Sequence, residues 1–217
     1  MRKKIAFVDC DAVLFNIAAF KLRCFESLGV FLEGKCVPDK VFALYKESKN
    51  DGLYDPDRHI ALLSEASGCS VSDLRKKFED FMRREAHQFM YADAELFLQR
   101  LAEVGYEVWI ATAGVEWFQE YKIPIDFYRC IAGVKVTRDQ TKTSVIGQFA
   151  DPEKDDIVLF DDSKNVINTM RIVFPNVFTV QVVRDRDANP YAVAAIAHEY
   201  ALDLEEAFGR VLYRNQI

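Results

Sequence analysis

The stretch Ile5-Ala6-Phe7-Val8-Asp9-Cys10-Asp11 decides the fold and contains the first candidate functional residues. Its first four residues form a short, uninterrupted apolar run, which predicts a strand that is buried on both faces. Two carboxylates, Asp9 and Asp11, follow directly. Ligands of an open parallel sheet bind beyond the carboxyl ends of the strands, so both acids lie where a site is expected.

Three further apolar runs predict more strands of the same kind, at residues 108–111, 157–160 and 177–182. Amphipathic helical patterns alternate with them and begin at Asp93 and Ser163. A third helical pattern opens at Asn189-Pro190 and runs through Tyr200 and Leu204. This alternation predicts an α/β fold with a doubly wound parallel sheet.

Residues 15–92 interrupt this rhythm because they contain no convincing strand. Asp55-Pro56 predicts the start of a helix that ends at Gly68, and a capping-box pattern at Ser70 predicts the start of another. Residues 48–52 predict a loop. The sequence therefore predicts two domains, an α/β core (1–14 and 93–217) and an inserted α-helical domain (15–92).

The composition is that of an acidic globular protein and narrows the classes of partner. The 217 residues carry 28 Lys and Arg against 34 Asp and Glu, a net charge of −6, so nucleic acid is not expected as a partner. No stretch approaches the roughly 18 apolar residues of a membrane span. The five cysteines show no CxxC spacing for a zinc site or a redox pair. We expect a cytoplasmic protein, a monomer or homodimer, that binds neither nucleic acid nor membrane.

The predicted strand ends gather acidic side chains at one edge of the sheet. Asp9 and Asp11 follow the first strand, Thr112 ends the next, and Asp161-Asp162 end the third. Carboxylates this close repel one another, so a hard cation with oxygen ligands is needed to hold them together. A DxD alone is typical of a turn, but two acidic pairs after two buried strands favour a site.

Three segments together resemble the motifs of the haloacid dehalogenase (HAD) superfamily. Residues 7–14 (FVDCDAVL) resemble its first motif, residues 108–114 (VWIATAG) its second, and residues 158–163 (VLFDDS) its acidic fourth motif. The resemblance implies a Rossmann-like α/β core. The helical insert after the first motif resembles the C1-type cap of the superfamily, which closes over the site and excludes water.

The resemblance also implies a role for each site residue. Asp9 would be the nucleophile that forms an aspartyl-phosphate, and Asp11 would be the general acid and base. Thr112 and the backbone N–H of Ala113 would bind the phosphoryl group. A carboxylate nucleophile divides a difficult hydrolysis into two easier steps, and a second carboxyl group can protonate the leaving oxygen.

Mg²⁺ is the cofactor that the resemblance implies. Its ligands would be a carboxylate oxygen of Asp9, the backbone carbonyl of Asp11, and Asp162. Asp161 would be a second ligand or an outer-shell partner. Mg²⁺ commonly takes one or two carboxylates together with substrate phosphate and water, which agrees with this set.

The third motif of the superfamily is a lysine near the start of a helix. Lys142, directly before a helix expected at residues 143–149, fits best, and Lys135 is the alternative. The chain departs from the superfamily pattern in three ways: Ala12 stands where Gly is usual, Val166 stands where a later acid is usual, and the Lys-Pro pair is missing. No departure removes a chemical role, so the chain resembles a divergent member.

These residues lead to the hypothesis of a Mg²⁺-dependent phosphatase that acts on a small phosphorylated metabolite. Asp11 favours phosphoester chemistry, because true haloacid dehalogenases lack this second carboxylate. A phosphomutase or phosphotransferase of the same superfamily stays open, as does a catalytically inactive protein that binds a phosphorylated ligand. A phospho-accepting receiver domain is disfavoured, since it would be shorter and would carry its acceptor after the third strand.

Overall fold

The structure, a computed structural model, describes residues 2–32, 35–184, 194 and 196–214. Packing divides the chain into two compact units. The core unit comprises Met1–Phe15, Met90–Ala113 and Pro124–Ile217, and the helical unit comprises Asn16–Phe89 and Gly114–Ile123. Residues 114–123 were expected in the core domain. They pack with the helices instead, because the Phe118 ring contacts the rings of Phe20 and Phe78.

A parallel sheet forms the centre of the core unit. Its described strands are β1 Lys4–Val8, β4 Glu107–Ala113, β5 Gly133–Thr137, β6 Asp156–Asp161, β7 Phe178–Val182 and β8 Glu199–Ala201. They follow the order β5-β4-β1-β6-β7-β8, and every neighbouring pair runs parallel. The chain leaves β1 toward β4 and β5 on one side and toward β6, β7 and β8 on the other. This order confirms the predicted doubly wound sheet.

Four of these strands lie where apolar runs predict them, whereas β5 and β8 follow no such run. The two unpredicted strands form the two edges of the sheet, and β5 is partly exposed along its whole length. An edge strand is covered on fewer sides than a central one, so its sequence can include residues such as Gly, Lys and Glu. A search for continuous apolar runs therefore misses it.

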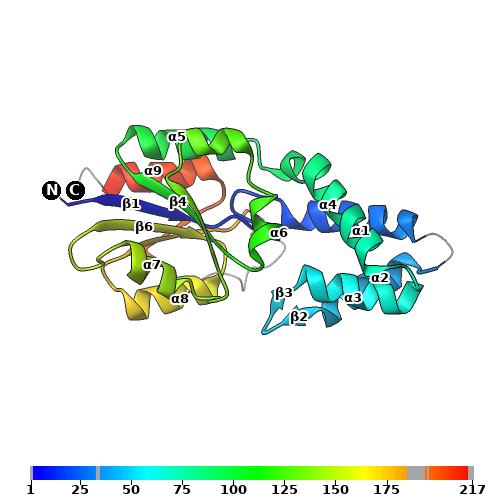
Figure 1. Ribbon diagram of the computed structural model, residues 1–217. Coiled ribbons are helices and arrows are strands. Elements are labelled where there is room, and N and C mark those ends of the chain that lie inside the picture. Colours follow the sequence, from blue (N-terminus) through cyan, green and yellow to red (C-terminus); the bar gives the residue numbers. More distant parts are fainter. Residues whose placement is uncertain (1, 33–34, 185–193, 195, 215–217) are drawn as a thin grey trace. The chain divides into compact units, whose positions relative to one another are not determined.

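Helices cover both faces of the sheet. Figure 1 shows α5 (Ala94–Glu103) and α9 (Leu204–Arg214) on one face, and α7 (Thr143–Phe149) and α8 (Lys164–Val173) on the other. A 3₁₀ helix spans Ile125–Arg129. The helices α5, α7 and α8 occupy the positions that the sequence predicts. The Ser163 hydroxyl caps α8, as its type and place favour.

The third predicted helix of the core is wrong in its later part. Its expected start, Asn189-Pro190, lies outside the described residues. Tyr200 belongs to β8 and pairs with Gln181 of β7, while Leu204 begins α9 as a separate helix. Pairing with the sheet thus overrides the helical spacing of these apolar residues.

The side chains of β1 alternate between the two helical layers. Ile5 and Phe7 belong to the apolar cluster that also contains Ile146 of α7. The intervening residues of β1 are equally buried, so the strand is covered on both faces as its apolar run predicts. By the same alternation, Asp9 follows on the face that carries α7.

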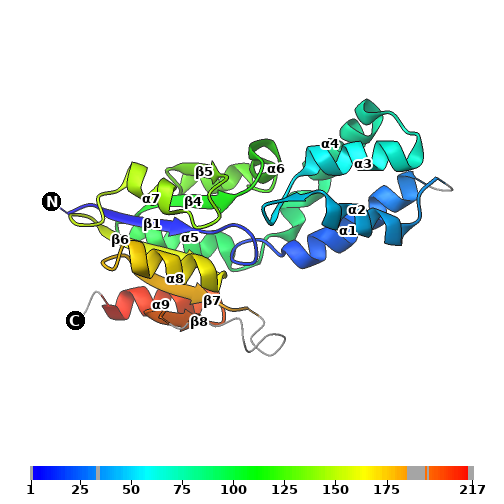
Figure 2. The same cartoon turned by 90° about the horizontal axis from the view of Figure 1, so that it is seen from below.

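The helical unit consists mainly of α-helices, which Figure 2 shows from a second direction. Its described elements are α1 Ile17–Phe31, α2 Pro38–Glu47, β2 Lys49–Asn50, β3 Leu53–Tyr54, α3 Pro56–Ser67, α4 Val71–Glu85, a 3₁₀ helix Ala86–Phe89, and α6 Glu116–Glu120. The Asp55 carboxylate caps α3, and Gly68 ends it with a φ of 69°. Residues 48–52, predicted as a loop, contain β2 as well as the turn of the β2–β3 hairpin, so the prediction is right only for the turn. The expectation that residues 15–92 contain no strand is wrong for these two short strands. None of the described helices is long and apolar enough to span a membrane.

His59 of α3 is fully buried in the helical unit. Its Nε2 atom lies 3.1 Å from the carbonyl oxygen of Val41, and its Nδ1 atom lies 2.9 Å from the hydroxyl of Tyr54. One donor and one acceptor satisfy a neutral imidazole. Burial lowers the pKa of His59 from 6.5 to about 4.

We expect the helical unit to lose stability as the pH falls from neutral toward pH 4, because the unfolded chain binds a proton at His59 near pH 6.5 and the folded unit does not. The contribution of His59 to the free energy of unfolding should fall by about 3 kcal/mol across that range. Amide hydrogen exchange in α3 measures this effect. His59→Gln should lose this part of the pH dependence, and equal pH dependence in both proteins would contradict the buried neutral histidine.

Candidate active site

Strands β1 and β6 bring two of the predicted acids to one edge of the sheet. Val8 pairs with Phe160, and the Asp9 N–H donates to the Phe160 carbonyl at 2.9 Å. Asp9 directly follows β1 and Asp161 ends β6, so the two acids lie at the same level of adjacent parallel strands. This edge is the carboxyl end of the sheet, where ligands of such folds bind.

Thr112 and Ala113 end β4, the strand on the other side of β1. They pair with Val136 and Thr137 of β5, and Thr112 is buried. The register of β1 and β4 places both residues at the same edge of the sheet as Asp9. The fold therefore brings Thr112 and Ala113 to the edge of the sheet where Asp9 lies.

A buried lysine lies between two of the carboxylates. The Nζ atom of Lys142 is 2.7 Å from Asp9 Oδ1 and 2.6 Å from Asp161 Oδ2, and these side chains are 3, 9 and 0% exposed. The alternative lysine, Lys135, lies instead 4.1 Å from the ring centre of Phe149. The structure therefore brings Lys142, and not Lys135, to the acidic side chains.

Asp139 builds the turn that holds Lys142. Its carboxylate accepts hydrogen bonds from the N–H groups of Thr141 and Ser144, at 2.9 and 3.0 Å, and from the hydroxyls of Thr141 and Thr143. Burial alone would raise the pKa of Asp139, but these bonds hold it well below its usual value. Lys142 then adopts a left-handed conformation, φ 60°, directly before α7. Sequence reasoning missed Asp139, although an Asp followed by Thr and Ser before a helix is a turn signal.

Asp9, Asp161 and Asp162 form a cluster that could hold a metal ion. One carboxylate oxygen of each lies within 4.8 Å of the other two, and this is the metal-ligand cluster found among the residues that the structure describes. When all three carboxylates are ionised, their negative charge exceeds the one positive charge of Lys142, and this excess matches a divalent cation. Because all the donors are oxygens, the residues fit Mg²⁺ better than a softer metal.

Burial and repulsion control the protonation of this cluster. Burial raises the pKa of Asp9 well above its usual value, against the opposing charge of Lys142. Burial and then the charge of Asp161 raise the pKa of Asp162 to about 7. Burial alone would lower the pKa of Lys142, but Asp161 and Asp9 hold it above its usual value. A bound cation would relieve the same repulsion.

Asp11 lies in a tight loop after β1, and the metal-ligand cluster of the described residues does not include its carboxylate. The next residue, Ala12, has a φ of 62°, and its N–H donates to the Phe15 carbonyl at 2.8 Å. This left-handed conformation explains why the motif usually has Gly at this place. The charge of Asp11 raises the pKa of Asp162, so the two side chains interact electrostatically.

Gln181 of β7 is a buried polar residue that sequence reasoning missed. Its Nε2 donates to the carbonyl of Asp162 at 2.8 Å, and its Oε1 accepts the N–H of Ala194 at 2.7 Å. The sequence signal for Gln181 is a single amide side chain within an otherwise apolar run.

Val166 stands where the superfamily has a later acid. In the structure it belongs to the apolar cluster that packs against β1.

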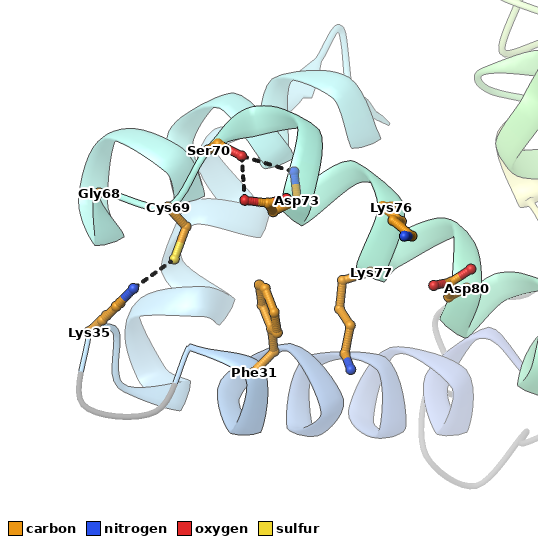
Figure 3. Close-up of a pocket in the computed structure, with 9 residues that line it drawn as sticks. All are labelled: Phe31, Lys35, Gly68, Cys69, Ser70, Asp73, Lys76, Lys77 and Asp80. Atoms are coloured by element: carbon orange, nitrogen blue, oxygen red, sulfur yellow. Dashed lines mark hydrogen bonds between the residues drawn. The ribbon is translucent and has the colours of Figure 1, made fainter.

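The helical unit contains a separate pocket of about 510 Å³ (Figure 3). Phe31, Lys35, Cys69 and Lys77 are among its lining residues, and Lys35 Nζ lies 3.6 Å from Cys69 Sγ. The pocket contains none of the predicted site residues. We therefore place the candidate active site in the core unit.

Lys142→Met should destabilise the core unit by about 3–5 kcal/mol, because it leaves Asp9 and Asp161 buried without their cation. Lys135→Met removes a lysine that contacts aromatic rings and should cost about 1 kcal/mol. Urea unfolding at neutral pH without divalent cations compares the two variants. Equal losses in the free energy of unfolding would contradict the buried charge cluster.

Comparison with known proteins identifies the fold through structure alone. No known family profile and no curated relative match the sequence. A haloacid dehalogenase-like hydrolase from Burkholderia xenovorans matches with a TM-score of 0.78 and 14% identity, over 96% of this chain and 98% of that one. Other solved structures agree with this match.

YfnB, a HAD hydrolase from Bacillus subtilis bound to magnesium, matches with a TM-score of 0.67 and 16% identity, over 97% of this chain and 99% of that one. A HAD phosphatase from Thermococcus onnurineus matches with a TM-score of 0.63 and 17% identity, over 96 and 97% of the two chains. Two L-2-haloacid dehalogenases are also similar. These likenesses extend over nearly the whole chain and confirm the fold that the motifs imply. The chain has the fold of the haloacid dehalogenase-like hydrolases.

Proposed function

We propose that the protein is a Mg²⁺-dependent phosphatase that hydrolyses a small phosphorylated metabolite through an aspartyl-phosphate on Asp9. The observation that carries this proposal is the buried cluster of Asp9, Lys142, Asp161 and Asp162 at the carboxyl edge of the sheet. The cluster combines a fixed carboxylate, a buried cation and oxygen ligands for a metal. Phosphoryl transfer depends chiefly on such positioning and charge neutralisation.

The first half of the reaction transfers the phosphoryl group to Asp9. A carboxylate oxygen of Asp9 attacks phosphorus while the bond from phosphorus to the leaving oxygen breaks. The protonated carboxyl group of Asp11 gives its proton to that oxygen, which departs as an alcohol. Thr112 and the N–H of Ala113 hold the phosphoryl oxygens, and the ammonium of Lys142 offsets their charge.

The second half of the reaction releases phosphate. Asp11, now ionised, takes a proton from water as the water oxygen bonds to phosphorus. The bond between phosphorus and Asp9 breaks, which restores the Asp9 carboxylate. One carboxyl group thus serves as acid and then as base, so the site returns to its starting protonation.

Asp9, Asp162 and the backbone carbonyl of Asp11 would hold the metal ion. Bound Mg²⁺ would neutralise charge on the phosphoryl oxygens. Both oxygens of Asp161 already accept bonds, from Lys142 at 2.6 Å and from the Ser163 N–H at 2.9 Å. This favours Asp161 as the residue that orients Lys142 rather than as a direct ligand. The magnesium bound to YfnB supports the choice of metal.

Asp11 favours a phosphatase over a dehalogenase. The similar solved structures include both kinds of enzyme, so the fold by itself does not choose between them. An alkoxide leaving group needs a proton, whereas a halide leaves without one. A carboxyl group two residues after the nucleophile is therefore useful to a phosphatase and has no such task in a dehalogenase.

The purified protein should release inorganic phosphate from small phosphomonoesters when Mg²⁺ is present, and a chelator should abolish this activity. Asp9→Asn should lose about 10³-fold or more, because the nucleophile is gone. Asp126→Asn is the matched control, since Asp126 is an exposed acid of the core unit that pairs with Arg129. A phosphate-release assay with 4-nitrophenyl phosphate and a panel of alkyl phosphates measures the activity of the wild type, with Mg²⁺ and with chelator, and of both variants.

Two outcomes would contradict this proposal. Halide release from 2-haloacids, without phosphate release from any ester, would identify a dehalogenase. Full activity of Asp9→Asn would exclude Asp9 as the nucleophile.

Asp162→Asn should weaken Mg²⁺ binding by at least about 10-fold, because it removes a charged oxygen ligand. Isothermal titration calorimetry at neutral pH measures the dissociation constant for the wild type, for Asp162→Asn and for the Asp126→Asn control. Unchanged affinity in Asp162→Asn would show that the metal binds elsewhere.

A further inference from the structure

Arg184, two residues beyond β7, donates four hydrogen bonds to the described residues of the core unit. Its Nε and Nη2 atoms donate to the carbonyl oxygen of Val13 at 2.9 and 2.8 Å. Its Nη1 and Nη2 atoms donate to the Asp93 carboxylate at 3.1 and 2.8 Å. The guanidinium also lies 3.7 Å from the ring centre of Tyr91. These contacts fix the planar guanidinium on two edges and one face.

Val13 belongs to the loop that carries Asp11. Other carbonyls of this loop accept backbone N–H groups, namely those of Cys10, Leu14 and Phe15. The Val13 carbonyl is bound by the Arg184 side chain instead. Arg184 therefore connects the end of β7 with the turn that follows the first two acids.

The loop needs such support because of its backbone conformation. Ala12, directly after Asp11, has a φ of 62°. A residue with a Cβ atom keeps this conformation only where its surroundings impose it. Releasing the Val13 carbonyl would allow the loop to relax, and the Asp11 side chain would move with it.

Asp93 anchors the other side of Arg184. Its carboxylate also accepts the N–H of Leu204, the first residue of α9, at 3.2 Å. The sequence predicts Asp93 as the side-chain cap of α5, but its carboxylate makes no such bond and serves Arg184 and Leu204 instead. Burial alone would raise the pKa of Asp93, yet the bonds from Arg184 and Leu204 hold it below its usual value.

We propose that Arg184 is a positioning residue that holds the Asp11 carboxyl group in place for proton transfer, with Asp93 as its anchor. This inference rests on the proposed function, since it concerns the proton that Asp11 gives to the leaving oxygen. It implies a selective defect. Poor proton delivery slows the hydrolysis of esters whose leaving group would depart as an unstable alkoxide. It has little effect on the hydrolysis of esters whose leaving group is a stable anion.

The test compares kcat for an alkyl phosphate and for 4-nitrophenyl phosphate in the wild type, Arg184→Met, Arg184→Lys and Asp11→Asn. We expect Arg184→Met to lose about 100-fold on the alkyl ester and less than about 5-fold on the aryl ester. Asp11→Asn should show the same difference between the alkyl and the aryl ester, with a larger loss of kcat on the alkyl ester. Arg184→Lys should recover little of the kcat on the alkyl ester, because one ammonium group cannot replace the planar guanidinium that binds Val13 and Asp93 together.

Arg214→Met is the matched control. Arg214 is a partly buried arginine of the same unit, and its Nη2 atom lies 2.7 Å from Asp156. Arg214→Met should change kcat for the two esters by the same factor, whatever its effect on stability. An equal loss on both esters in Arg184→Met would overturn the proposal and leave Arg184 a purely structural role.

Amide hydrogen exchange provides a readout that does not depend on activity. The amides of Leu14 and Phe15, which donate to Cys10, should exchange at least about 10-fold faster in Arg184→Met and at the wild-type rate in Arg214→Met. Unchanged exchange in Arg184→Met would overturn the inference alone. A wild-type protein that hydrolyses no ester would overturn the proposed function and, with it, the proton transfer assigned to Asp11.

Discussion

The contact of Lys142 with Asp9 and Asp161 is the interaction on which the site depends. Taking three charged groups out of water costs several kcal/mol for each ion unless they pair with good geometry. The pairing requires that β1 and β6 end at the same level and that α7 begins beside them. The Asp139 turn meets the last requirement, because it places Lys142 in a left-handed conformation directly before that helix.

The surroundings of the two acids of the first motif differ, and this difference suits different chemical tasks. Asp9 is buried against the ammonium of Lys142, whereas Asp11 lies in a loop whose shape depends on Ala12 and on Arg184. A carboxylate fixed beside an ammonium suits the role of nucleophile, and a carboxyl group on a separate loop suits proton transfer to the leaving oxygen and from water. The excess negative charge of the Asp9, Asp161 and Asp162 cluster favours the binding of a divalent cation.

The sequence was informative where burial imposes a simple pattern and uninformative where distant partners decide. The apolar runs before Asp9 and Asp161 predict central strands because both faces of those strands are covered. The edge strands β5 and β8 lack that constraint and were missed. Arg184 could not be found in advance, since its partner Val13 is 171 residues away in the chain. The sequence thus names candidate residues that belong to local motifs, but it does not name the residues that support them.

Trapping the covalent intermediate tests the central claim, which is that Asp9 receives the phosphoryl group. The protein would be mixed with a good phosphomonoester substrate and Mg²⁺, quenched during turnover and treated with borohydride, which reduces an aspartyl-phosphate to homoserine. Mass spectrometry of the N-terminal peptide then locates the modified residue. Our account predicts homoserine at position 9. Homoserine at another acid, or none while phosphate is being released, would contradict it.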